Sequence, residues 1–273
     1  MGFAARVLLD SVSPQGVRLT TMEVIFPRFV LAEFNTHRVF SRNSASSRAI
    51  PTTKLIERVI EDPVVPAEWG RNRRGMSASE VLSEVEEREA LRLWLSARDA
   101  AVEHARRLAE LKVHKQVLNR ILEPFLWHTV VVTATEWRNF FALRCTPNAQ
   151  PEIRRAAALM REALDASTPR RVKRGEWHLP LIQDDERTLD AERLKAVSAA
   201  RCARVSYLTH DGQRDLERDL ELYERLSADR HLSPFEHVAT PAEDDGFHAN
   251  FRGWVQMRRS IEAGLAGARS DVR

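Results

Sequence analysis

Residues 37–48, HRVFSRNSASSR, are dense in anion-binding residue types, with three arginines, four serines, one asparagine and one histidine. Small residues let backbone N–H groups approach a phosphate, and arginine binds phosphate through paired charge-assisted hydrogen bonds. The segment has no Gly-Lys-Ser or Gly-Lys-Thr, so it is not the phosphate loop of nucleoside triphosphatases. It therefore predicts an anion cradle, with a solvated polar loop as the alternative.

Two further arginines stand beside apolar sequence, Arg120 in NRILEPF and Arg144 in FFALRC. A buried guanidinium is costly unless it is paired. Each side chain therefore either packs its stem while its head reaches solvent, or clamps an anion or a carbonyl inside a pocket.

The segment HLSPFEH over 231–237 brings His231, Glu236 and His237 close together. Their spacing matches no zinc signature, and Pro234 interrupts the helix that a His-Glu-x-x-His site needs. We therefore predict no metal site, and we interpret Glu236 as a hydrogen-bond acceptor or a helix cap.

The elements that must position these residues mix strands and helices. Strands are predicted over 5–10, 17–26 and the β-branched run 127–134. Helical spacing predicts helices over 29–40, 76–112 (with a break near residue 96), 114–122, 136–144, 149–164 and 217–229. Loops are predicted over 41–51, 62–75 and 167–190, and extended segments over 231–241 and 247–251. Without βαβ alternation, this pattern predicts an α+β fold.

Composition excludes several classes of protein. Of 273 residues, 43% are hydrophobic and 30% charged, which is enough apolar material for a core and excludes a disordered chain. The net charge of +3 does not favour nucleic-acid binding. No apolar run approaches the length of a membrane span, and two cysteines, Cys145 and Cys202, build no disulfide framework. We expect a cytoplasmic protein without membrane association and with both cysteines in the core.

Three groups of residues together resemble the flavin-dependent thymidylate synthase family. The first is similar to the family's Arg-His-Arg signature with its spaced Ser and Arg, and consists of His37, Arg38, Val39, Ser41, Asn43, Ser46 and Arg48. The second is Arg120 with Pro124 and Thr129, followed by NFFALRCTPNAQPEIR over 139–154. The third is ARVSY over 203–207 and HLSPFEH over 231–237. The internal spacings match in all three groups, which cover about half of the chain.

The order of the groups differs from that of a typical member, in which the third group precedes the first. The chain therefore resembles a circularly permuted member, which is tolerated where the original termini lie close together. The resemblance implies a mixed sheet with long helices, in a single domain over 1–273 with a helical insert at about 76–112. We expect residues 203–240 to pack against residues 36–50, within one chain or across a subunit contact.

Four positions depart from the family pattern. Thr36 replaces the leading Arg of the signature, Ser44 stands where an acidic residue is expected, and Glu33 stands where a Gln is expected. An Arg expected between Thr129 and Asn139 is missing.

The resemblance implies reductive methylation of dUMP at C5 to dTMP, with methylenetetrahydrofolate as carbon donor and NADPH as the reductant of FAD. The residues implied to bind the nucleotide are Glu33, Ser44, Ser46, Ser47, Arg48, Arg120 and Arg144. Those implied to bind FAD are His37, Arg38, Val39, Asn43, Asn139, Ser233 and Glu236. Arg144 is the implied catalytic residue, because a donor at the pyrimidine carbonyl oxygens makes C5 nucleophilic without a protein nucleophile. Shared sites in a homotetramer are implied as well.

Two alternatives remain open. The chain could act on another pyrimidine nucleotide, such as dCMP or UMP, or transfer another C5 group, because few hydrogen bonds decide such a choice. It could also be a non-catalytic nucleotide- or nucleic-acid-binding relative, which Thr36 and the missing Arg motivate.

Overall fold

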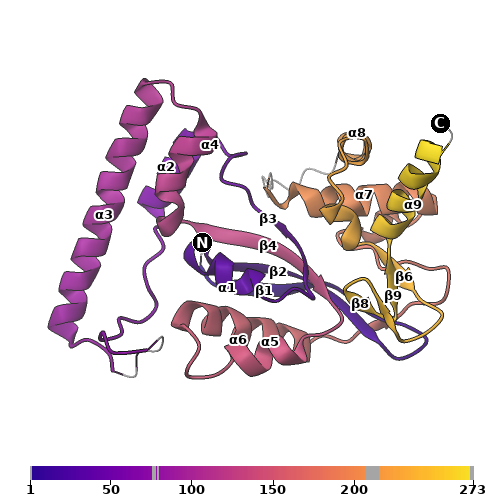
Figure 1. Cartoon of the computed structure of the whole chain (residues 1–273), viewed down its shortest axis with the longest axis horizontal. Helices are drawn as coiled ribbons and strands as arrows, with labels where there is room; N and C mark the ends of the chain where they lie inside the picture. The colour runs from indigo at the N-terminus through magenta and orange to yellow at the C-terminus, as the bar shows by residue number, and fades with distance from the viewer. Residues whose placement is uncertain (1, 76–77, 79, 207–214, 271–273) are drawn as a thin grey trace.

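The computed structural model describes residues 2–75, 78, 80–206 and 215–270 (Figure 1). A five-stranded sheet crosses the middle of the molecule in the order β3-β4-β2-β1-β5. Its strands are β1 Ala4–Val12, β2 Arg18–Pro27, β3 Ser41–Ser44, β4 Trp127–Ala134 and β5 Arg170–Arg171. All neighbours are antiparallel except β1 and β5, which are parallel. The predicted α+β class and mixed sheet are confirmed, as are the three predicted strands.

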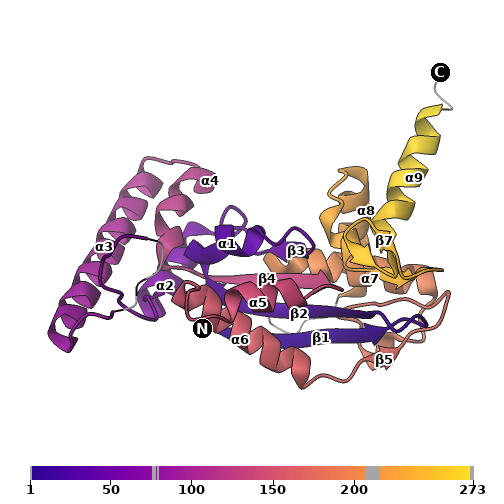
Figure 2. The same cartoon turned by 60° about the horizontal axis from the view of Figure 1, so that its bottom comes forward.

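One face of the sheet is apolar. Its side chains alternate along β2 and β4, as the pleat requires, and comprise Met22, Val24, Phe26, Val130, Val132 and Ala134. Helices α5 Arg138–Arg144 and α6 Pro151–Asp165 cover this face (Figures 1 and 2). Pro151 opens α6, where its missing N–H costs nothing, and Ile153, Ala157 and Met160 face the sheet.

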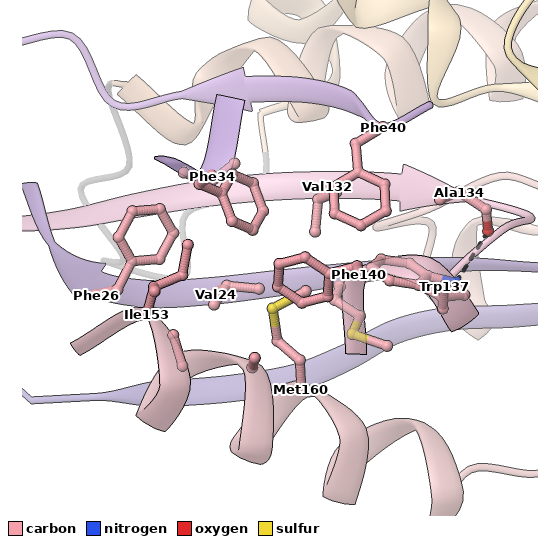
Figure 3. Close-up of a cluster of buried hydrophobic side chains, with 14 of the residues drawn as sticks. Val24, Phe26, Phe34, Phe40, Val132, Ala134, Trp137, Phe140, Ile153 and Met160 are labelled. Atoms are coloured by element: carbon pink, nitrogen blue, oxygen red, sulfur yellow. Dashed lines mark hydrogen bonds between the residues drawn. The ribbon is translucent and has the colours of Figure 1, made fainter. Parts of the chain in front are cut away.

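An aromatic cluster ties three elements to this face (Figure 3). Phe34 comes from α1 Leu31–Asn35, Phe40 precedes β3, and Trp137 and Phe140 belong to the start of α5. The rings of Phe40 and Trp137 lie 4.7 Å apart, and those of Phe34 and Phe140 5.8 Å apart. Packing of this kind fixes the polar segment between Phe34 and Phe40 without needing apolar residues inside it.

The other face of the sheet carries buried polar side chains. Thr21 and Thr133 share a 2.7 Å hydrogen bond between neighbouring strands, and each hydroxyl also contacts a buried histidine. Thr21 Oγ1 lies 2.8 Å from Nε2 of His178, and Thr133 Oγ1 lies 2.7 Å from Nδ1 of His237. Ser11 Oγ closes the chain at 2.8 Å from Nδ1 of His178. All five residues are fully buried, so the chain of hydrogen bonds replaces solvent for each of them.

A helical group forms one end of the molecule (Figures 1 and 2). It consists of α2 Thr52–Glu61, α3 Glu84–Glu110, α4 Lys115–Leu118 and the 3₁₀ segment η2 Asn119–Phe125. The helix predicted over 76–112 begins later because Ser83 caps it in a capping box with Glu86, and it runs without a break near residue 96. Met76, Ser77 and Ser79 lie outside the described residues.

The C-terminal part forms the opposite end (Figure 2). Its helices are α7 Ala191–Ala203, α8 Leu216–Ala228 and α9 Met257–Ser270, with 3₁₀ turns η4 Arg204–Ser206 and η5 Ser233–Glu236. Its short strands are β6 Ala239–Pro241, β7 Phe247–His248, β8 Phe251–Arg252 and β9 Trp254–Gln256. The last residue of the ARVSY group, Tyr207, lies outside the described residues.

Several local predictions were wrong. The helix expected over 29–40 is confined to η1 Arg28–Val30 and α1, since the chain must turn at Thr36 to pair as β3. The loop expected over 41–51 contains β3, because its backbone pairs with the otherwise unpaired edge of β4. The segment expected to be extended over 231–241 forms η5 first. The helix expected over 114–122 becomes 3₁₀ at Asn119.

Other elements had not been predicted or were shorter than expected. Helices α2, α7 and α9 were not predicted from the sequence. The loop expected over 167–190 contains β5 and η3 Asp184–Glu186. None of the described helices is long and apolar enough to cross a bilayer.

Candidate active site

A cavity of about 410 Å³ opens where the turn after α1 meets the start of α5. Its lining residues are Thr36, His37, Arg38, Val39, Glu136, Arg138, Asn139 and Phe140. Two segments about 100 residues apart in sequence therefore form one site, held together by the aromatic cluster beneath it. The cavity collects His37, Arg38, Val39 and Asn139, four of the residues predicted to bind FAD.

His37 forms the inner wall of this cavity. Only 7% of its surface is exposed, and its ring lies edge-on to Phe140 at 4.8 Å. Arg144 Nε donates to His37 Nε2 at 3.0 Å. Burial, together with the positive charges of Arg144 and Arg42, lowers the pKa of His37 to about 4. The ring is thus neutral at pH 7, and because Nε2 accepts, its proton is on Nδ1.

Arg144 is held by the segment that it helps to shape. Its Nη2 donates to Thr36 Oγ1 at 3.1 Å and to the Glu33 carbonyl at 3.4 Å. The Thr36 hydroxyl itself donates to the Glu33 carbonyl at 2.7 Å. An arginine at position 36 would place a second positive charge next to Arg144 and repel it. The neutral Thr36 instead accepts a hydrogen bond from Arg144, so this departure from the family pattern is compatible with the observed position of Arg144.

Residues 36–50 pack against residues 203–240 within one chain, which confirms that expectation. Strand β3 contacts both η4 and η5. Asn43 Nδ2 donates to the Cys202 carbonyl at 3.3 Å. Arg42 donates a hydrogen bond to the His37 carbonyl at 3.3 Å. Burial lowers the pKa of the Arg42 guanidinium, whereas the negative charge of Glu236 raises it.

A second cavity, of about 390 Å³, lies on the C-terminal side of this contact. Its lining residues are Glu236, His248, Ala249, Asn250, Gln256, Arg258, Arg259 and Glu262. Glu236 is paired with Arg258 at 2.5 Å. Asn250 Nδ2 bridges toward the first cavity, donating to the Val39 carbonyl at 3.1 Å and to Ser41 Oγ at 3.0 Å. Ser233 opens η5 beside Glu236, so the predicted FAD residues fall at and between the two cavities.

Two residues predicted to bind the nucleotide, Ser47 and Arg120, meet elsewhere, at Glu123. Its Oε1 accepts from Ser47 Oγ at 2.6 Å and from Arg120 Nη1 at 2.8 Å, and lies 3.0 Å from Arg28 Nη2. Burial alone would raise the pKa of Glu123, but the bonds from Ser47 and Arg28 hold it below its ordinary value. We call Ser47, Arg28 and Arg120 the cradle donors.

The backbone around the cradle is clamped from the helical end. Asn119, fully buried, donates from Nδ2 to the carbonyls of Ser47 at 2.8 Å and Ile50 at 3.1 Å. Lys115 Nζ donates to the Ala49 carbonyl at 3.1 Å. Arg28 Nη1 lies 2.9 Å from Nδ1 of His128, whose pKa is lowered to about 3 by burial and then by Arg28. The loop therefore keeps its shape without help from Glu123.

Arg144 and the cradle donors share no hydrogen bond or ion pair among the described residues, because Arg144 contacts the turn that precedes β3 and Ser47 lies in the loop that follows it. Ser41 pairs with Thr133 near the end of β4, whereas the Ala45 N–H bonds the Thr129 carbonyl near its start. Ser47 is six residues beyond Ser41, past the end of the strand at Ser44 and at the start of a turn. Arg48 is exposed and pairs with no described residue.

The sequence missed one functional candidate and could have found another. Nothing in the sequence marks Arg28, whereas Glu123 stands three residues after Arg120, a spacing that pairs side chains on one helical face. Ser44 ends β3 and Ser46 follows in the cradle loop. Glu33 Oε2 is buried with no partner among the described residues.

Histidines, carboxylates and the two cysteines are the remaining candidate ligands or nucleophiles, and both cysteines are free thiols. In the described part of the chain, no three His, Cys, Asp or Glu side chains could hold a metal ion. The His237 ring instead points inward to Thr133. Cys202 is fully buried, which raises its pKa, and Cys145 is half-buried.

Fold and site together define an α+β protein with a cavity beside the turn that precedes β3 and a cluster of arginines around Glu123 near the loop that follows it. The chain belongs to the flavin-dependent thymidylate synthase family: residues 12–170, more than half of it, match the family described as thymidylate synthase complementing protein. The match includes the cradle, the His37 cavity and Arg144, and ends before the ARVSY and HLSPFEH groups.

Two solved structures of the UMP/dUMP methylase PolB from Streptomyces cacaoi are similar to the chain. The complex with 5-Br dUMP has a TM-score of 0.47 at 15% identity and covers 59% of this chain and 89% of PolB. The complex with 5-Br UMP has a TM-score of 0.48 at 17% identity and covers 59% and 88%. No curated protein sequence matches the chain.

Proposed function

We propose that the protein is an FAD-dependent thymidylate synthase that methylates dUMP at C5, with methylenetetrahydrofolate as carbon donor and NADPH as reductant. The observation that carries the proposal is the cavity that collects His37, Arg38, Val39 and Asn139. These residues come from two distant segments, and the family resemblance assigns all four to the flavin.

The residues present fit a dinucleotide. Arg38 and Arg138 line the cavity, are exposed and suit a pyrophosphate, since arginine binds phosphate oxygens in pairs. Asn139 offers both a donor and an acceptor, and Phe140 an apolar wall. Glu236 and Ser233, across the Asn250 bridge, would hold the far part of the cofactor. The bound flavin would supply the hydride, while the chain orients it and excludes water.

The nucleotide site would be shared between subunits. Arg144 contacts the turn that precedes β3, whereas Ser47 lies in the loop that follows it. A homotetramer in which the cradle of one chain faces the His37 cavity of another would place the phosphate on Arg48 and Arg120 and the pyrimidine against Arg144. The exposure of Arg38, Val39 and Arg48 supports such a contact.

A circular permutation accounts for the position of the HLSPFEH group. The packing of η5 against β3 supports it, because a group that follows the others in sequence still reaches the same site. We treat the whole chain as one domain of the family, with α3 as an addition at its helical end.

The test is FAD binding followed by turnover. Purified protein reconstituted with excess FAD should show flavin absorbance and convert dUMP to dTMP with the folate and NADPH. Folded protein that takes up no flavin would contradict the proposal. UMP and dCMP belong in the same assay, because Ser44 replaces the acidic residue of the family pattern and so changes the charge and the hydrogen bonds that the site offers. Turnover of UMP or dCMP alone would favour the second candidate, a related C5 transferase.

A further inference from the structure

The cradle already holds an anion. Three donors converge on a single oxygen of Glu123, at 2.6 Å from Ser47, 2.8 Å from Arg120 and 3.0 Å from Arg28. Convergent donors of this kind, two guanidinium groups and a hydroxyl, are those that a phosphate oxygen accepts from. The carboxylate of this chain therefore sits where the phosphate of a ligand would sit.

Two of the cradle donors, Ser47 and Arg28, are also anchored by groups other than Glu123. Ser47 is fixed through its carbonyl by Asn119, and Arg28 is fixed through Nη1 by His128 and the Ala45 carbonyl. The three cradle donors all meet Oε1 of Glu123, and its other carboxylate oxygen has no hydrogen bond to them. Rotation of this one side chain would leave Ser47 and Arg28 in position.

The site is open on one side. The Arg120 side chain is 49% exposed and that of Glu123 22%, while Arg28 is 14% exposed. Arg48 stands exposed next to Ser47 in the same loop. An incoming phosphate dianion would meet Arg120 and Arg48 from solvent before it reached Arg28.

We propose that Glu123 is the internal counter-anion of the cradle, and that the phosphate of a nucleoside monophosphate binds by displacing its carboxylate from Ser47 and Arg120. The inference rests on the proposed function only in taking the ligand to be a phosphate monoester. Glu123 then sets the affinity of the site. Its carboxylate partly neutralises the two arginines of the empty cradle and lowers the free energy gained when a phosphate binds.

Glu123→Gln is the deciding variant, because it keeps the shape and the accepting oxygen but removes the charge. Binding of inorganic phosphate and of dUMP is measured by calorimetry at low ionic strength for the parent and the variant. We expect Glu123→Gln to bind both about 10-fold more tightly, since a unit charge at contact distance in a half-exposed site is worth at least this much. Unchanged or weaker binding, or no binding to either protein, overturns the proposal.

Two further variants make the result specific. Glu103→Gln removes a carboxylate that pairs with Arg107 on the surface of α3, far from the cradle, and should leave phosphate affinity unchanged. Glu123→Asp keeps the charge but withdraws it by one methylene, so it should bind phosphate more tightly than the parent and less tightly than the Gln variant. If Glu123→Gln does not fold, this Asp variant decides alone, and parent-like affinity overturns the proposal.

FAD binding is measured in parallel on the same proteins. If the parent protein neither binds FAD nor turns over nucleotide, but the variants bind phosphate in the expected order of affinity, the proposed function is rejected and the role of Glu123 stands. The reverse pattern, normal FAD binding with an inverted phosphate series, rejects the role of Glu123 alone.

Discussion

Arg144 Nε donates a hydrogen bond to His37 Nε2 at 3.0 Å, which joins the two segments that line the larger cavity. The bond fixes the neutral histidine with its proton on Nδ1 and directs that N–H away from Arg144. It also means that Arg144 is positioned by this chain's own Thr36 and His37 before any ligand arrives. Preorganised donors of this kind lose little free energy in reorganising when charge develops nearby.

Arg144→Ala should lower kcat for nucleotide methylation by about 10²–10³, the usual cost of removing one charge-stabilising donor. Arg144→Lys should recover little of it, because an ammonium cannot engage both Thr36 and His37 as the planar guanidinium does. Steady-state turnover with FAD, folate and NADPH measures both. Parent-like turnover of Arg144→Ala would reject an activating role and leave Arg144 as a structural link.

Arg144→Ala should raise the pKa of His37 from about 4 toward its ordinary value, because the positive charge of Arg144 is the second cause of the lowered pKa. Burial, the first cause, remains, so the shift should be partial. A histidine ring titration by NMR measures it, with Arg42→Ala as the companion that removes the third cause. A His37 pKa unmoved by Arg144→Ala would contradict the contact itself.

Arg48→Ala should weaken nucleotide binding while leaving kcat nearly intact. Phosphate contacts are similar in the ground state and the transition state, so their loss appears in KM. Arg48 is exposed and makes no contact with the described residues, so the fold should not change. Arg107→Ala on α3 is the matched control, an exposed arginine far from the cradle. An equal fall of kcat and kcat/KM would place Arg48 in the chemical step instead.

Stability should fall steeply below about pH 6. His128, His178 and His237 are buried with pKa values lowered to about 3, chiefly by burial. Above the unfolded value of about 6.5 all three are neutral in both states and contribute nothing. Between about 6 and 4 the unfolded chain binds three protons that the folded chain excludes, which lowers the free energy of unfolding by about 4 kcal/mol per pH unit. Urea unfolding at stepped pH measures the slope, and a flat profile over this range would contradict the burial of these rings.

Thr133→Val should lower the free energy of unfolding markedly, although valine and threonine have nearly the same volume. The Thr133 hydroxyl lies between Thr21 and His237, and the other ring nitrogen of His237 already lacks a partner among the described residues. Each buried polar group left unpaired costs about 1–3 kcal/mol, so we expect a loss of about 2–5 kcal/mol in the free energy of unfolding. Thr133→Ser keeps the hydroxyl and should lose far less. Equal losses for Val and Ser would show that packing, and not the hydrogen-bond chain, stabilises this face.

Local sequence determined the elements whose own pattern carries the signal. Strands β1, β2 and β4 and helix α6 follow from alternation or helical spacing, because their apolar faces must be buried whatever lies opposite. The residue types of the segment 37–48 were visible as well, because small polar residues and arginines together suit an anion, although a solvated loop has the same composition.

Tertiary structure alone decided how those residues combine. Strand β3 forms in a polar segment because the edge of β4 offers unpaired backbone groups, a long-range cause that no window of sequence contains. Glu123 and Arg28 form an ion pair in the cradle because the end of β2 and the start of β4 lie side by side there. The His178–Thr21–Thr133–His237 chain joins residues more than 100 positions apart. Such partners are chosen by burial, where every polar group must find one, and burial is a property of the folded chain.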